Sequence, residues 1–293
     1  YVKDILEKNN KTLVGVLIKN NDYVNFEPLN KKIIGQFIVE KGGYFNHDDI
    51  VKAEIVKVNK QYITIKIIKL LFNKNQDFST TNLLIEENNL DLDFEPDLDN
   101  IAKELNKPIL NKEKEKRIDL TNKLFVTIDG EDTKDFDDAI LVEKLENNNF
   151  LLSVAISDVS YYVKQDSPLD QESYKRATSI YLLEKTIPML PFHLSNGICS
   201  LSPNDERLVV VCQVEIDANG NERNIKLFRG VIKSKARLTY KQVNEFWFEK
   251  NINNISSSEL QNMLMLAKQL SDVISKTQHE KGYINFQIQA PKI

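Results

Sequence analysis

The feature that most constrains this chain is an acidic loop between two β-rich segments, with one aspartate at the end of the first segment and three more within four residues before the second. LFVTID precedes the loop and AILVEK follows it, so the chain leaves one strand, doubles back and enters the next. Carboxylates this close repel one another, and burial adds a desolvation cost unless a cation neutralises them. The sequence therefore predicts a charged site at this loop. The four acids are Asp129, Asp135, Asp137 and Asp138.

The spacing of these acids indicates which cation they suit. Oxygen ligands at this density fit Mg²⁺ or Mn²⁺, which in such a site activate water and stabilise the charge of phosphoryl transfer. A calcium loop counted from Asp129 would place Lys134 at the glycine position and Ile140 at the glutamate position. A merely solvated turn remains an alternative. Asp158, inside an apolar segment, is predicted to be a structural acid rather than a fifth ligand.

The organisation of the chain predicts a mixed α/β (α+β) protein. Five short β-rich runs within residues 11–72 favour a small barrel of the OB or cold-shock type over residues 1–80. Residues 81–117 are acidic and then basic, and we interpret them as a linker with one helix over residues 99–106. Residues 118–293 alternate strand and helix patterns and form the predicted α+β domain.

Local signals define the elements of this second domain. A capping serine before a proline starts one predicted helix, and apolar residues at 3.6-residue spacing define the last one. The predicted elements are a strand over 150–163, a helix from Ser167 to about Thr178, a strand over 208–216, a turn at Asn219 and Gly220, a basic strand near 224–238, a helix from Thr239 and a helix over 259–281.

The distribution of charge along the chain indicates whether a nucleic acid could be its partner. The formal net charge is −4, which argues mildly against a nucleic-acid binder held by bulk charge. The acid is concentrated in residues 81–99 and 118–142, and the rest of the chain sums to +8. A local basic surface is therefore compatible with the acidic total.

A basic stretch over residues 223–241 contains seven cations and no acid. Lys233, Lys235 and Arg237 recur at period two, so one face of a strand would present three cations to a polyanionic backbone. An edge strand protected from aggregation by its charge explains the pattern equally well.

Aromatic side chains beside such a surface could stack on bases, at about 1–3 kcal/mol per base. Most aromatic side chains instead belong to the core, and that alternative holds for each one here. The candidates are Tyr161, Tyr162, Tyr181 and Tyr240 in the second domain, and Tyr23, Phe26 and Tyr44 in the first.

Cys199 and Cys212, with three histidines, provide neither a disulfide framework nor a zinc-binding spacing. The sequence also lacks a signal peptide and an apolar run long enough to cross a membrane. We therefore expect a monomeric cytoplasmic protein with no membrane partner. Because the chain begins with Tyr1 and ends in the strand-like run 284–293, we expect it to be an internal piece of a longer protein.

Four blocks of the sequence carry a family resemblance. They are TIDGEDTKDFDDAI, VAISDVSYYV, SIYLLEKTIPMLPFHLSNGICSLSPNDERLVVVC and GVIKSKARLTYKQV. Together they closely resemble the RNB domain of the bacterial ribonuclease II and ribonuclease R family over residues 118–293, and IDGED is closer to the ribonuclease R branch. Residues 11–80 resemble the cold-shock domain that precedes RNB in that family.

The resemblance implies a processive, hydrolytic 3′→5′ exoribonuclease of RNA turnover that depends on Mg²⁺, or Mn²⁺, and converts single-stranded RNA to nucleoside 5′-monophosphates. Asp129 and Asp138 match the family's principal metal-binding carboxylates, and Asp135 completes the site. Asp137 matches the acid regarded as most critical for cleavage.

Two tyrosines also match positions of the family. Tyr181 matches an aromatic residue that packs on the 3′-terminal nucleotide, and Tyr240 matches a further tyrosine that contacts RNA. The family's catalytic arginine block, its S1 domain and its first cold-shock domain have no counterpart in these residues, so we expect the fragment alone to be weak or inactive. The alternatives are a non-catalytic RNA-binding protein and an RNB pseudoenzyme. EDTA should abolish the activity of a nuclease, whereas a non-catalytic RNA-binding protein should still bind RNA in EDTA.

Overall fold

The computed structural model describes residues 11–20, 23–40, 43–73, 79–249, 251–255 and 257–284. The strand-like run predicted over 284–293 lies outside these residues, apart from Ile284. The chain forms two compact units, one of residues 1–93 with 180–187 and one of residues 94–179 with 188–293. Across the described ranges, no helix is both long and apolar enough to traverse a bilayer.

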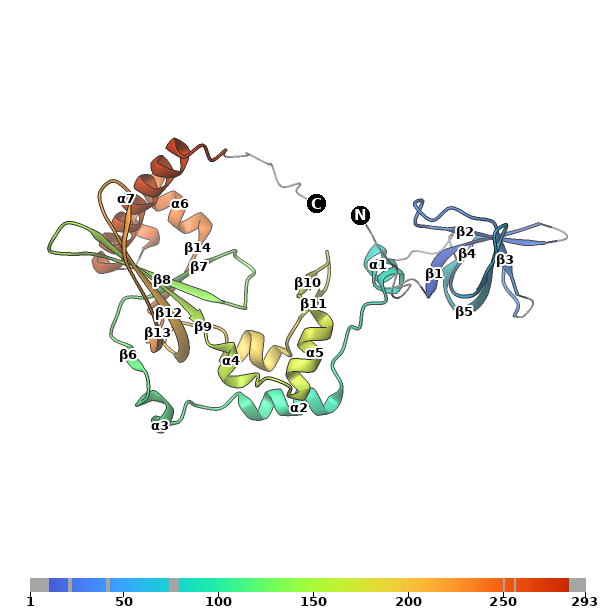
Figure 1. Cartoon of the computed structure of the whole chain (residues 1–293), viewed down its shortest axis with the longest axis horizontal. Helices are drawn as coiled ribbons and strands as arrows, with labels where there is room; N and C mark the ends of the chain where they lie inside the picture. The colour runs from blue at the N-terminus through green and yellow to red at the C-terminus, as the bar shows by residue number, and fades with distance from the viewer. Residues whose placement is uncertain are drawn as a thin grey trace. The chain divides into compact units, whose positions relative to one another are not determined.

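The first unit contains a five-stranded sheet of order β2-β1-β4-β5-β3. All its pairings are antiparallel except that of β3 with β5, and β2 contacts β3, so the sheet curves into a partly open barrel around an apolar core (Figure 1). The predicted OB-type barrel is confirmed. Its strands are β1 (Thr12–Lys19), β2 (Val24–Pro28), β3 (Phe37–Val39), β4 (Asp49–Val58) and β5 (Ile63–Asn73).

Three helices occupy most of the segment that we interpreted as a linker. Glu86 fastens the first helix to the barrel through ion pairs with Lys52, at 3.0 Å, and with Lys69. Leu98 and Ala102, four residues apart on the second, are buried in the core of the second unit. The helices are α1 (Thr80–Asn88), α2 (Pro96–Leu105), where a helix was predicted over 99–106, and α3 (Asn111–Lys114).

A seven-stranded sheet of order β14-β7-β8-β9-β12-β13-β6 organises the second unit. The inner pairings are antiparallel, whereas the outer pairs β14–β7 and β6–β13 are parallel. The strands are β6 (Ile118–Leu120), β7 (Val126–Asp129), β8 (Asp138–Lys144), β9 (Phe150–Ser157), β12 (Glu206–Ile216), β13 (Glu222–Lys233) and β14 (Ala236–Thr239); the short pair β10 (Ile180–Tyr181) and β11 (Thr186–Ile187) belongs to the first unit.

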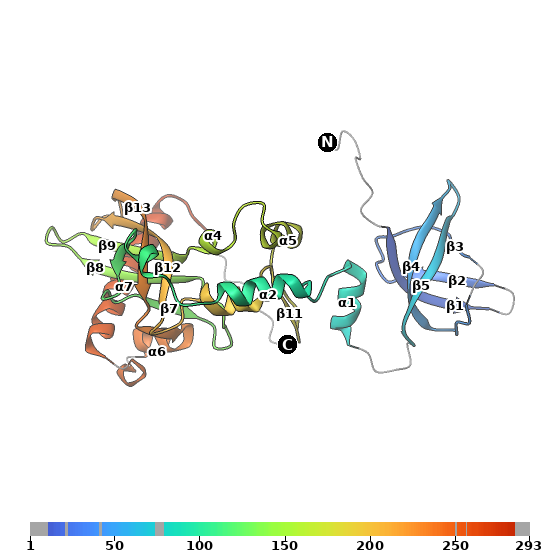
Figure 2. The same ribbon diagram turned by 90° about the horizontal axis from the view of Figure 1, so that it is seen from below.

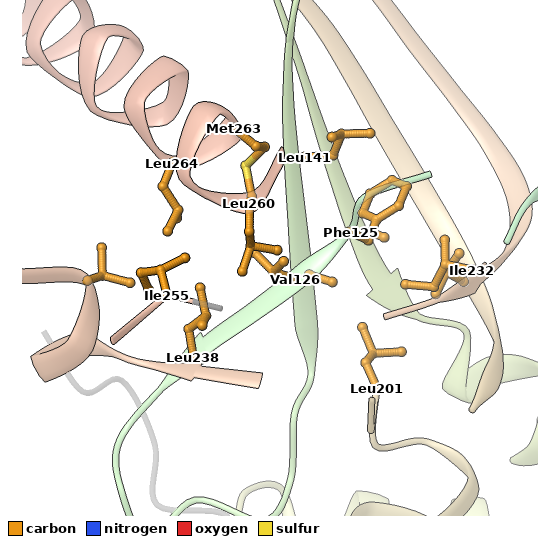
Figure 3. Close-up of a cluster of buried hydrophobic side chains, with 14 of the residues drawn as sticks. Phe125, Val126, Leu141, Leu201, Ile232, Leu238, Ile255, Leu260, Met263 and Leu264 are labelled. Atoms are coloured by element: carbon orange, nitrogen blue, oxygen red, sulfur yellow. The ribbon is translucent and has the colours of Figure 1, made fainter. Parts of the chain in front are cut away.

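Two helices, α6 (Tyr240–Phe248) and α7 (Ser258–Glu280), pack against this sheet (Figure 2). Leu260, Met263 and Leu264 of α7 point toward the strands and share a buried cluster with Val126 (Figure 3). The apolar spacing predicted for the last helix is thus confirmed. Thr239 caps α6 in a reciprocal capping box, as expected for a helix that starts there.

A second buried cluster of this unit lies around α2, α4 (Val159–Tyr162) and α5 (Pro168–Arg176). Ser167 caps α5 by accepting a hydrogen bond from the Asp170 amide, as predicted. The strand predicted over 150–163 is wrong beyond Ser157, because the chain turns at Asp158 into α4.

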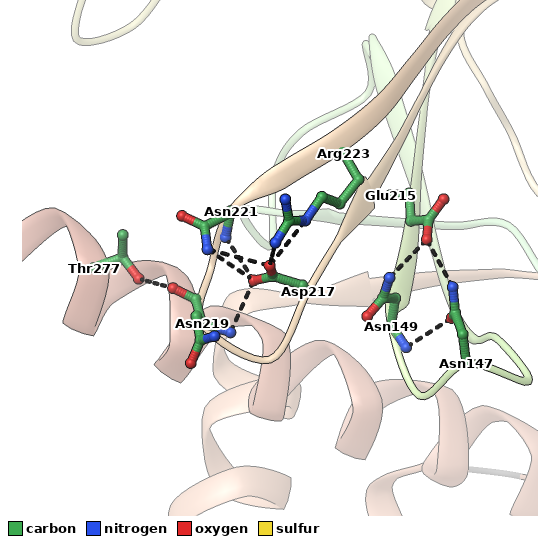
Figure 4. Close-up of polar contacts among 8 residues, drawn as sticks. All are labelled: Asn147, Asn149, Glu215, Asp217, Asn219, Asn221, Arg223 and Thr277. Atoms are coloured by element: carbon green, nitrogen blue, oxygen red, sulfur yellow. Dashed lines mark hydrogen bonds and ion pairs between the residues drawn. The ribbon is translucent and has the colours of Figure 1, made fainter.

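The turn between β12 and β13 is built around Asp217 and Gly220 (Figure 4). The backbone amides of Asn221 and Asn219 each donate to Asp217 Oδ1 at 2.9 Å, and such bonds lower the pKa of Asp217 to about 2. Gly220 has a φ of +79°, and a Cβ there would lie 2.2 Å from Oγ1 of Thr277. Only glycine therefore fits this turn without rearrangement.

The β8–β9 hairpin is tied to β12 by Glu215. The side-chain amides of Asn149 and Asn147 donate to its carboxylate (Figure 4). The side-chain amide of Asn224 also donates to it, and the three bonds together lower the pKa of Glu215 to about 2. The two hairpins therefore form one connected block.

Candidate active site

The four aspartates lie in the connection between β7 and β8. Asp129 is the last residue of β7, and Asp138 is the first residue of β8. Burial raises the pKa of Asp129, and the charges of Asp138, Asp137 and Asp135 raise it further, whereas Arg237 lowers it. Burial also raises the pKa of Asp137, followed by the charges of Asp135 and Asp138. The structure thus brings all four acids into one electrostatic cluster.

One oxygen of this cluster is left without a partner. Oδ2 of Asp129 is buried and accepts no hydrogen bond, which costs free energy unless a cation or donor is supplied. Across the ranges that the structure describes, no three His, Cys, Asp or Glu side chains converge to metal-ligating distance. The donor set therefore fits a hard divalent cation in its chemistry, but it is not a preformed cage.

Residues that the sequence did not single out fix the backbone of the acidic loop. The fully buried Ser200 bonds to the loop through its hydroxyl, and Leu201 bonds to it through its amide. No local signal marks a serine for this role, because its partners are more than 60 residues away.

The basic stretch does not form the predicted continuous strand. β13 ends at Lys233, and β14 begins at Ala236. Between them Lys235 Nζ donates to the Thr121 carbonyl at 2.7 Å. Arg237 points to the acidic loop, where its Nη2 donates to a backbone carbonyl at 2.7 Å. Lys233, Lys235 and Arg237 therefore do not share one strand face, and a role in RNA binding remains a prediction for each.

The aromatic candidates separate into exposed and buried residues. Tyr181 on β10 and Tyr240 at the start of α6 are exposed. Phe26 and Tyr162 are buried, so the alternative of a core position is confirmed for both. Tyr161 is half-buried beneath cationic side chains.

The barrel carries a groove of about 880 Å³ lined by aromatic side chains. Tyr23 and Tyr44, both candidates from the sequence, are exposed along it, and Lys19 adds a cation. Tyr62 also lines the groove and is not among the candidates from the sequence, because it begins a β-rich run whose pattern does not separate it from core positions.

Two buried groups of the second unit have structural roles. Oδ2 of Asp158 lies 2.8 Å from Nη1 of Arg117, and both side chains are only 1% exposed, which confirms Asp158 as a structural acid. Burial alone would raise the pKa of Asp158, but hydrogen bonds from Ser160 and Arg117 lower it. Burial raises the pKa of Cys199 to about 12, so this thiol is not an activated nucleophile.

Comparison with known proteins identifies the same region. The RNB domain family matches residues 117–293. The chain is 38% identical over all its 293 residues to ribonuclease R of Mycoplasmopsis pulmonis, and 37% identical over 286 residues to ribonuclease R of Thermotoga maritima, 96% of this chain. It spans 40% of the length of each of these curated relatives.

Solved structures show the same fold. Mycoplasma genitalium RNase R in complex with double-stranded RNA superposes with a TM-score of 0.80 and 28% identity, over 97% of this chain and 51% of that one. Yeast Ssd1, a pseudonuclease, shares the fold at a TM-score of 0.71 and 15% identity, over 90% of this chain and 34% of that one. By its sequence match and its fold, the chain belongs to the RNB domain family and is similar to that family's ribonuclease R members.

Proposed function

We propose that the protein of which this chain forms a part is a Mg²⁺-dependent, hydrolytic 3′→5′ exoribonuclease that degrades single-stranded RNA processively to nucleoside 5′-monophosphates. The cluster of four coupled carboxylates, with its buried and unpartnered Asp129 oxygen, is the observation that carries this proposal. The RNB match and the ribonuclease R relatives support it.

The residues divide into distinct roles under this proposal. Asp129, Asp135 and Asp138 would hold Mg²⁺, or Mn²⁺, and the ion would activate water and stabilise phosphoryl-transfer charge. Asp137 accepts a hydrogen bond from the attacking water, or contributes to a second metal position, and so orients the attack on the terminal phosphodiester. Tyr181 stacks on the 3′-terminal nucleotide.

A doubly labelled cleavage assay tests the proposal. Single-stranded RNA labelled at either end is incubated with the complete protein, with Mg²⁺ or with EDTA. We expect 5′-labelled RNA to shorten progressively, 3′-labelled RNA to release labelled mononucleotide at once, and both reactions to stop in EDTA. Cleavage that persists in EDTA, or internal fragments from both labels, would contradict the proposal.

The aromatic groove of the barrel supports RNA binding as a second function, which would remain in a protein without catalysis. The exposed rings of Tyr23 and Tyr44 offer stacking platforms, and each stacked base contributes about 1–3 kcal/mol. The groove is therefore proposed to hold single-stranded RNA.

Replacing both Tyr23 and Tyr44 with Ala is expected to weaken binding of single-stranded RNA by at least about 10-fold, since two stacking contacts are lost. Fluorescence anisotropy in EDTA measures binding without cleavage. Tyr174→Ala, which removes an equally exposed ring from α5 outside the groove, is the matched control and should leave Kd unchanged. An unchanged Kd for the double variant would show that RNA does not use the groove.

A further inference from the structure

The acidic loop is held by side chains from two distant segments, and these contacts place its carboxylates. We propose that Ser200 and Arg237 are positioning residues of the active site, which clamp the loop backbone so that its acids can converge on a metal ion. This inference rests on the proposed function, because it concerns the same loop. Neither residue contacts the reacting atoms in this role.

The first clamp comes from the segment after η1 (Leu194–Ile198). The Phe136 amide donates to Ser200 Oγ at 3.0 Å, and Ser200 Oγ donates to the Lys134 carbonyl at 2.9 Å. The adjacent Leu201 amide donates to the Phe136 carbonyl at 2.8 Å. Because Ser200 is fully buried, loss of its hydroxyl would remove the partner of these two loop atoms away from bulk solvent, which costs free energy.

The second clamp comes from β14. Nη2 of Arg237 donates to the carbonyl oxygens of Gly130, at 2.7 Å, and Glu131, at 2.5 Å. Its guanidinium also lies 5.7 Å from the centroid of the Phe136 ring. One side chain therefore holds the start of the loop and contacts the ring near its end.

The positions of these bonds in the loop explain how they orient its carboxylates. All five end on backbone atoms, so they hold the loop without engaging a carboxylate. Phe136, bonded at both its amide and its carbonyl, lies between Asp135 and Asp137, and Gly130 directly follows Asp129. Fixing these backbone atoms sets the direction in which three of the four acids leave the main chain.

The test compares Ser200→Ala with Ser153→Ala in the complete protein. Ser153 is equally buried, but its hydroxyl bonds to Gln213 rather than to the loop, so it controls for the loss of a buried hydroxyl. We expect Ser200→Ala to lower kcat about 10–100-fold with KM for RNA within about twofold, and to weaken Mn²⁺ binding, followed by electron paramagnetic resonance, by a similar factor. Ser153→Ala should change neither quantity.

Two further variants keep the test decisive. Ser200→Thr retains the hydroxyl and should recover most of kcat, whereas Arg237→Gln removes the second clamp and should reproduce the loss if Ser200→Ala does not fold. Equal kcat and equal Mn²⁺ affinity in Ser200→Ala and Ser153→Ala would overturn the positioning role while leaving the proposed function intact.

Hydrogen exchange at the Phe136 amide separates the two hypotheses. If the unsubstituted protein neither cleaves RNA nor binds Mn²⁺, the proposed function fails, yet this amide still reports on the clamp. Faster exchange in Ser200→Ala than in Ser153→Ala shows that Ser200 holds the loop, and identical exchange shows that it does not.

Discussion

Replacing Asp137 with Asn is expected to reduce RNA cleavage by the complete protein roughly 10³-fold or more, with RNA affinity within about twofold. The substitution keeps the shape of the side chain but removes a negative charge from a cluster in which neighbouring carboxylates raise the pKa of Asp129 and of Asp137. An amide oxygen is a weaker metal ligand and a weaker acceptor for a water proton, and losses of this size are typical when a group that acts in the transition state is removed.

Single-turnover cleavage at saturating Mg²⁺ and RNA binding in EDTA measure the two halves of this prediction. Asp272→Asn is the matched control, since it makes the same change in an exposed acid of α7 that pairs only with Lys268 among the ion pairs described. It should cleave at the unsubstituted rate. If Asp137→Asn still degraded RNA at a rate near that of the control, Asp137 would have no essential role in cleavage.

Replacing Asp158 with Ala is expected to lower the free energy of unfolding by about 3–5 kcal/mol. The change removes the fully buried carboxylate partner of the Arg117 guanidinium and leaves it, within the described part of the chain, with Glu113 alone, and removing one partner of a buried pair is costly. Arg117 also pairs with Glu113 at 2.9 Å, so the loss affects the connection from α3 into the sheet. Urea unfolding followed by circular dichroism measures the difference.

The control for this prediction is an exposed pair of the same type. Asp272→Ala, which removes the partner of Lys268 on α7, should cost no more than about 0.5 kcal/mol. A second variant, with Arg117→Met added to Asp158→Ala, should be more stable than Asp158→Ala alone, because it removes the buried guanidinium that has lost its buried partner. A loss below about 1 kcal/mol in Asp158→Ala would show that the buried pair contributes little.

The elements that were predicted correctly have local causes. The cap at Ser167, the start of α6 after Thr239 and the apolar face of α7 each depend on residues within about one or two helical turns. The same holds for the acidic loop, since β-rich segments directly flank its carboxylates. These signals lie within short windows of the sequence and so can be read from it.

The predictions that were wrong depend on partners far away in the sequence. The strand after Ser157 stops because Asp158 turns inward to Arg117, and the basic strand breaks because Lys235 reaches Thr121. The role of the Ser200 hydroxyl also depends on a distant partner, because it bonds to the backbone of Phe136. These residue pairs are too far apart in the sequence to appear in a local periodic pattern. Tertiary contacts therefore determine where these strands end.

The parallel edges of the second sheet have a consequence for the order of folding. The hairpins β8–β9 and β12–β13 join neighbouring segments, whereas β14 reaches β7 only after most of the domain sequence has been made. Closing a long loop is slow because its entropy is lost before the contact is gained. Arg237 therefore reaches the acidic loop late, and its positive charge offsets the repulsion among the loop's carboxylates only after the local hairpins have formed.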